Sequence, residues 1–281
     1  MIKRPVNERI LICELTSEDM KSVKTEMARL RQTLPDEPIG FKRSKQYVQG
    51  DIDFIINRMR GDDRNCHGVS MVCNENPLSG SNFIDIMNPA TFSELAKMTL
   101  HQHSESCESL MTRAQGKFAP GVPFEHFNSL LVGLYSTTGM KQRLKKGEFS
   151  YDSYSRDTGG HFIMAELNMS TSTVVFYDSI NSDIRQSSYF DFALIARVFQ
   201  NIYSYYKLKR NLPLQLIIFQ QQALKSQGNN DCGCHTLVNI ELLLREQDPA
   251  LQTFNSEIIQ KIRKYHFLLR HQFVNDFRLK L

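Results

Sequence analysis

The chain has 281 residues, of which 41% are hydrophobic and 23% charged, a balance typical of a folded globular protein with a substantial core. The formal net charge of +4 is small for this length, so the sequence predicts no nucleic-acid-binding surface, which would need clustered basic residues. No apolar stretch reaches the ~18 residues of a membrane-spanning helix, so we expect no membrane span. We also expect no Sec-type signal peptide, because no long apolar segment follows the basic N-terminus.

The N-terminal half is predicted to be mainly helical. Helical periodicity extends over four segments, 16–34, 44–61, 88–116 (one or two helices) and 123–136. Short strand-like runs are confined to 8–15 and 67–74.

The C-terminal half mixes strands and helices. Two short strand-like runs, 161–167 and 172–179, flank the turn-sized segment NMST and predict a hairpin. The segments that follow are an amphipathic helix over 189–210, a buried strand over 214–220, a mostly buried helix over 233–246 and a final helix over 255–277. The fold class that these elements indicate is α+β.

The six cysteines occur at low density and with irregular spacing. In a chain of this size, such a pattern favours free thiols in a reducing compartment over a disulfide framework. We therefore expect a cytosolic protein.

Cys232 stands between Asp231 and Gly233, directly before the helix predicted over 233–246. Asp231 is a suitable N-cap, and the unpaired N–H groups and dipole of a helix N-terminus favour a thiolate over a thiol. Gly233 has no Cβ and lets a ligand backbone approach closely. These features are typical of an activated cysteine nucleophile.

A histidine and a carboxylate that could serve this nucleophile lie in the predicted hairpin. His161 opens the first strand and Asp178 ends the second, so antiparallel pairing brings them close together at the open end. Such a carboxylate holds the imidazole in one tautomer and stabilises the imidazolium. Glu166 is the competing carboxylate, but its odd offset from His161 places it on the opposite face of the strand.

Gln227 lies five residues before Cys232, where its side-chain amide could donate to a developing oxyanion together with the backbone N–H of Cys232. The glutamines of 220–222 are alternatives, although they end the preceding strand. We interpret Cys234 and His235 as the first turn of a buried helix, since Cys-x-Cys-His is not a usual zinc spacing. No metal and no other cofactor is predicted.

Three segments together, GGHFIMAEL, VVFYDS and QGNNDCG, resemble the ordered His, Asp, Gln and Cys pattern of the CE clan of cysteine proteases. That clan includes the Ulp/SENP deSUMOylases, adenain, bacterial effector deubiquitinases and YopJ-type acetyltransferases. The resemblance implies a papain-like catalytic core over 120–281, with a central mixed sheet flanked by helices. Residues 1–119 lie outside the resemblance, and their own pattern predicts a mainly helical N-terminal extension, to which we assign substrate recognition. Phe162 stands where the Ulp/SENP group has Trp, which favours a divergent, bacterial member.

The resemblance implies that His161, Asp178 and Cys232 are catalytic, that Gln227 serves the oxyanion hole, and that Phe162 and Gly233 line the channel for the substrate tail. The implied reaction is hydrolysis of the bond after the C-terminal Gly of ubiquitin or a ubiquitin-like protein, whose conjugates would be the partners. Ubiquitin is the first expectation and SUMO the second. Acetyl transfer by the same Cys and His is an alternative, and a silent adaptor is disfavoured by the intact set. A bacterial effector of this type would be secreted into the host cell cytoplasm.

Overall fold

In this computed structural model the described residues are 21, 25, 28, 47–59, 70–74, 82–102, 104–118, 128–146, 160–180, 183–222, 224, 230–244, 247–252 and 254–271. The strand predicted over 8–15 and almost all of the helix predicted over 16–34 lie outside this set. Within it, no helix is long and apolar enough to cross a membrane.

The described strands form one six-stranded sheet in which spatial order follows chain order from β1 to β6. The strands are β1 (Ser70–Asn74), β2 (Asn82–Met87), β3 (Ser129–Ser136), β4 (His161–Asn168), β5 (Thr173–Tyr177) and β6 (Ile218–Gln222). The β2–β3 and β5–β6 pairs are parallel, and the other three pairs are antiparallel. The sheet is therefore mixed, as predicted. Its strands come from both sides of residue 120, since β1 and β2 precede that position and β3 to β6 follow it.

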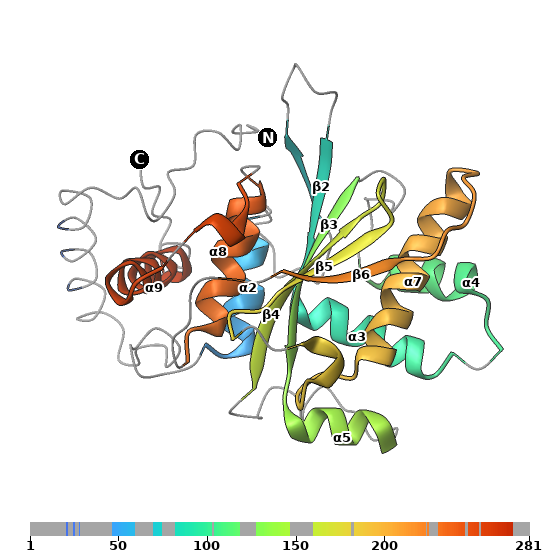
Figure 1. Cartoon of the computed structure of the whole chain (residues 1–281), viewed down its shortest axis with the longest axis horizontal. Helices are drawn as coiled ribbons and strands as arrows, with labels where there is room; N and C mark the ends of the chain where they lie inside the picture. The colour runs from blue at the N-terminus through green and yellow to red at the C-terminus, as the bar shows by residue number, and fades with distance from the viewer. Residues whose placement is uncertain are drawn as a thin grey trace.

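Helices cover both faces of the sheet (Figure 1): α2, α8 and α9 gather on one side, and α3, α4 and α7 on the other. The helix bounds are α2 (Gln49–Met59), α3 (Pro89–Leu100), α4 (Cys107–Phe118), α5 (Thr138–Lys146), α7 (Phe192–Lys209), α8 (Cys232–Leu244) and α9 (Ser256–His271). Two short 3-10 helices, η5 (Ile184–Gln186) and η6 (Pro249–Leu251), lie in the connections. The helices predicted around 44–61, 88–116, 189–210, 233–246 and 255–277 are confirmed.

The helix predicted over 123–136 is wrong, because Ser129–Ser136 forms the central strand β3. All eight residues of β3 are buried, and the strand pairs with β2 on one side and with β4 on the other. A strand covered on both faces loses the alternation of apolar and polar residues that marks a half-exposed strand. Its continuous apolar run cannot then be distinguished from a buried helix by periodicity.

The strand predicted as buried over 214–220 is shorter and lies at the edge of the sheet. β6 begins at Ile218, and its residues are exposed or only partly buried. The leucines before it are exposed as well, with Leu216 at 87%. Aliphatic composition predicted burial, but an outermost strand has a neighbour on one side only.

The predicted hairpin is confirmed, with β4 and β5 paired antiparallel. Asn168 supports the turn, since its side chain accepts hydrogen bonds from the backbone N–H of Ser170 and of Thr171, each at 3.0 Å. The first residue of β4 and the residue after β5 consequently lie at the same edge of the sheet. Helix α8 packs against β4, and this packing brings the predicted nucleophile to the sheet.

Candidate active site

His161 and Asp178 meet at the open end of the hairpin, as the sequence predicted. His161 Nε2 lies 2.8 Å from Asp178 Oδ1, a hydrogen-bonding distance. The pair is shielded from water, because His161 is only 4% exposed and Asp178 only 2%. A buried charge-assisted hydrogen bond of this kind holds the imidazole ring in one orientation.

The carboxylate of Asp178 is itself held in place. Its Oδ1 also accepts a hydrogen bond from the backbone N–H of Ile180 at 2.9 Å, within the turn that follows β5. Glu166, the competing carboxylate, has different partners. It accepts hydrogen bonds from Ser129 Oγ at 3.0 Å and from the Tyr177 hydroxyl at 3.3 Å. The structure therefore pairs His161 with Asp178.

Cys232 is the first residue of α8, and its side chain is hydrogen-bonded to the His161 ring. Since Nε2 of that ring faces Asp178, Nδ1 is the nitrogen left for the thiol. The imidazole thus bridges carboxylate and sulfur. Residues far apart in the chain are brought together because α8 packs on the strand that carries the histidine.

The surroundings of His161 favour its charged form. Burial lowers the pKa of the imidazole, but the hydrogen bonds that the ring makes to Asp178 and Cys232, together with their negative charges, outweigh burial and raise the pKa from 6.5 to about 9. At neutral pH the ring is therefore an imidazolium. A thiolate beside an imidazolium is the reactive form of a cysteine nucleophile.

Two aromatic rings pack beside the imidazole of His161. The rings of Tyr189 and Phe190 lie 5.4 Å and 6.1 Å from it, centroid to centroid. At the residue before the histidine, a Cβ added at Gly160 would overlap the ring of Tyr135. Glycine before His161 therefore lets this ring pack against the backbone that carries the histidine.

Phe162 and Gly233 are the residues predicted to line the channel for the substrate tail, and that role stays a prediction. Phe162 is fully buried, and its ring lies 4.3 Å from that of Tyr135, centroid to centroid. A Cβ at Gly233 would come within 2.8 Å of two carbon atoms of Tyr47. In this structure both residues pack inside the protein, Phe162 against a neighbouring strand and Gly233 against the segment before α2.

Gln227 lies outside the described residues, so its role as an oxyanion donor stays a prediction. Cys234 and His235 occupy the first turn of α8 and are buried, as expected for a core turn. Burial lowers the pKa of His235 to about 4, so this ring is neutral at physiological pH.

Arg263, which the sequence analysis did not single out, also reaches this region. Its guanidinium donates to the Asp231 carboxylate, the group that we predicted to cap the helix. No local pattern in α9 distinguishes this arginine from the other basic residues of the helix.

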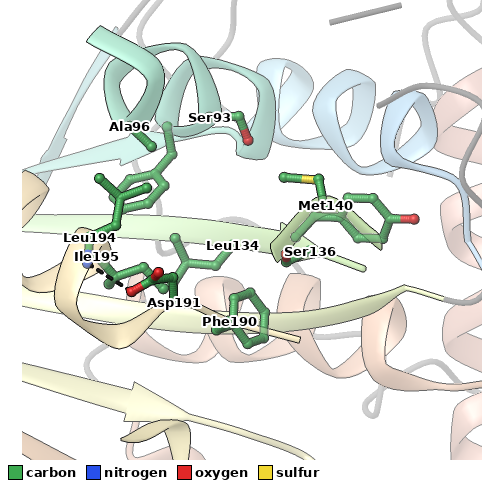
Figure 2. A pocket seen from close by; sticks show the side chains of 11 residues that line it. Ser93, Ala96, Leu134, Ser136, Met140, Phe190, Asp191, Leu194 and Ile195 are labelled. Atoms are coloured by element: carbon green, nitrogen blue, oxygen red, sulfur yellow. Dashed lines mark hydrogen bonds between the residues drawn. The ribbon is translucent and has the colours of Figure 1, made fainter. Parts of the chain in front are cut away.

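A pocket lies beside Phe190 (Figure 2), between α3, the end of β3, α5 and the start of α7. Phe190 belongs to its lining and also contacts the His161 ring. The pocket lining includes one carboxylate, that of Asp191, which accepts a hydrogen bond from the backbone N–H of Leu194 at 3.2 Å and so caps α7. The remaining walls are mostly apolar.

Among known proteins, the solved structures identify the fold of this chain. No family model and no curated protein sequence matches the chain. Among solved structures, the SUMO protease Ulp1 with its catalytic cysteine oxidised to a sulfenic acid is similar, with 13% identity and a TM-score of 0.54 over 93% of this chain and 98% of that one. The sulfinic acid form gives 11% identity and a TM-score of 0.55 over 95% and 100%. The Ulp1-like SUMO protease domain of Chaetomium thermophilum gives 16% identity and a TM-score of 0.48 over 98% and 97%.

The likeness extends over nearly the whole of the first two chains compared. This chain has the α+β fold of the SUMO protease Ulp1.

Proposed function

We propose that the protein is a cysteine protease that hydrolyses the bond after the C-terminal glycine of ubiquitin or a ubiquitin-like modifier. The observation that carries this proposal is the His161 imidazole, which bridges Asp178 and Cys232 inside a fold of the Ulp1 type. Each element of this arrangement has a role in acyl transfer by a cysteine nucleophile.

In the acylation step, the Cys232 thiolate attacks the carbonyl carbon of the modifier's C-terminal glycine. The electron pair of the carbonyl moves to oxygen and then returns as the C–N bond breaks. The His161 imidazolium donates its Nδ1 proton to the leaving amine, which departs neutral. The product is a thioester between Cys232 and the glycine.

In the deacylation step, water attacks the thioester and His161 Nδ1 accepts its proton. The C–S bond breaks, the modifier leaves with a free carboxyl group and the imidazolium–thiolate pair is restored. Asp178 stabilises the imidazolium through Nε2. The oxyanion is stabilised by the backbone N–H of Cys232 at the N-terminus of α8, and we assign Gln227 as the second donor.

The burial of the site supports a slender substrate. His161, Asp178 and Cys232 are each at most 5% exposed. Such burial favours a slender substrate segment over one with bulky side chains. A glycine at the end of a flexible tail has no Cβ and can reach the sulfur through a narrow channel.

Activity-based probes test this function. Ubiquitin, SUMO and NEDD8, each with a C-terminal electrophile, are incubated with the wild-type protein and with Cys232→Ala. We expect labelling of the wild type by the ubiquitin probe and loss of labelling in Cys232→Ala. The matched control is Cys107→Ala, which removes a partly buried thiol at the start of α4 and should label normally.

The other outcomes separate the alternatives. Labelling by SUMO alone would assign the same chemistry to a different modifier. If no probe labels the protein and acetyl-CoA leaves a stable acetyl group on Cys232, the protease proposal is wrong and acetyl transfer takes its place.

A further inference from the structure

Arg263 of α9 makes three hydrogen bonds to the two residues that precede Cys232. Its Nε and Nη2 donate to Asp231 Oδ1 at 3.0 Å and 2.6 Å, and Nη2 also donates to the carbonyl oxygen of Asn230 at 2.7 Å. The arginine side chain is 3% exposed. A buried, forked guanidinium bound to two consecutive residues restrains both their position and their orientation.

The restrained segment is the entry to α8. Asn230 has a φ of 66°, in the left-handed region, which turns the chain into the helix. The carbonyl oxygen of Asp231 accepts the first backbone hydrogen bond of the helix, from the N–H of His235 at 3.0 Å. Cys232 follows directly, so the position of its sulfur depends on the backbone that Arg263 holds.

The guanidinium also packs against the ring of Tyr47. Its Cζ lies 4.9 Å from the centroid of the Tyr47 ring, a cation–π contact. The Tyr47 hydroxyl accepts a hydrogen bond from Cys234 Sγ at 3.0 Å and lies 3.0 Å from His266 Nδ1. Gly233 packs on the same tyrosine. The segment before α2, the first turn of α8 and α9 are thereby joined around one buried arginine.

We propose that Arg263 is a positioning residue that sets the Cys232 sulfur against His161 by fixing the 230–231 backbone. This inference rests on the proposed function of Cys232 as the nucleophile. Arg263 does not touch the reacting atoms, and its effect passes through Asp231 and Asn230. Misplacement of a reacting group by about 1 Å is enough to lower a rate by ~100-fold.

The test is the pH dependence of alkylation of Cys232 by iodoacetamide, followed by mass spectrometry of the peptide that contains it. This probe needs no modifier. Arg263→Lys keeps the charge but loses the fork, and a lysine cannot reproduce the three bonds. We expect wild-type Cys232 to react rapidly below pH 7 because of its imidazolium partner. In Arg263→Lys the rate at pH 6.5 should fall by ~10-fold, and the profile should move to higher pH, toward that of His161→Ala.

A second variant guards against loss of folding. Asp231→Asn combined with Arg263→Gln removes both charges of the ion pair together, so neither is left without its partner. It should show the same displaced profile in a cooperatively folded protein. Lys261→Met, on the same helix, removes the ion pair between the half-buried Lys261 and the exposed Glu257 and serves as the control with a wild-type profile.

The outcomes distinguish this inference from the function on which it rests. If wild-type Cys232 reacts rapidly below pH 7 and both Arg263 variants keep that profile, the positioning role is wrong and the proposed function stands. If wild-type Cys232 reacts no faster than an ordinary thiol, the proposed function fails, and the positioning role fails with it.

Discussion

Replacing Asp178 by asparagine isolates the charge of the carboxylate from its geometry. Oδ1 of Asp178 accepts from both His161 and the backbone N–H of Ile180. An asparagine oxygen in the same place can keep both hydrogen bonds. The substitution therefore removes the negative charge beside the imidazole while the turn after β5 is retained.

The pKa of His161 gives the size of the expected effect. The rise from 6.5 to about 9 corresponds to ~3 kcal/mol in favour of the imidazolium, despite the opposing effect of burial. An opposite charge in direct contact changes the pKa of such a group by ~1 to 3. In Asp178→Asn we therefore expect the pKa of His161 to fall toward or below 7, so that much of the imidazolium is lost at neutral pH.

The assay is the pH dependence of kcat/KM with a modifier that carries a fluorogenic C-terminal amide. The imidazolium must protonate the leaving amine, so activity of the wild type should decline on the alkaline side as pH passes about 9. In Asp178→Asn this decline should begin nearer neutrality, and kcat/KM at pH 7.5 should drop by ~100- to 10,000-fold.

Folding stability provides an independent readout. Because the folded-state pKa of His161 lies above its unfolded value, the charged ring stabilises the protein fully below pH 6.5, and this contribution is lost as pH rises toward about 9. The decline of the unfolding free energy over this window should be shallower in Asp178→Asn than in the wild type.

The control is Asp183→Asn, which alters an exposed carboxylate that accepts from the backbone N–H of Arg185 in η5. It should leave the pH profile unchanged. An alkaline decline that stays near pH 9 in Asp178→Asn, with kcat/KM within ~3-fold of the wild type, would refute this role of the carboxylate charge.

Two further substitutions probe the frame of the site. Gly160→Ala introduces a Cβ that overlaps the ring of Tyr135, so urea denaturation should show a loss of ~1–3 kcal/mol, and an unchanged midpoint would contradict this packing. Glu166→Gln changes a carboxylate bonded to Ser129 and Tyr177, so kcat/KM should stay within ~2-fold of the wild type. A loss as large as that in Asp178→Asn would instead identify Glu166 as the partner of the histidine.

The candidate site was predictable where its chemistry is encoded locally. Cys232 precedes an apolar helical run, and His161 and Asp178 sit at the two ends of a short hairpin. Residue type and position within one element are enough to predict a thiol at a helix N-terminus or a pair across a ladder. Both predictions agree with the observed geometry.

The central and edge strands were harder, because burial depends on neighbours that are distant in the chain. β3 has no alternation since it is covered on both faces, and its sequence resembles that of a buried helix. β6 has an apolar sequence yet lies at the exposed edge. β2 (Asn82–Met87) was not predicted, although it pairs with β1 and β3.

By itself, the sequence determined the order of chemical groups, the hairpin that joins histidine to carboxylate, the helix that begins at the cysteine and the α+β class. Only the tertiary structure decided which residues support them. Phe162 packs against Tyr135 of β3, Gly233 packs against Tyr47, and Arg263 reaches the backbone before Cys232 from α9. The physical reason is range: caps, turns and dipoles act over a few neighbouring residues, whereas burial and ion pairing depend on which elements the whole fold brings into contact.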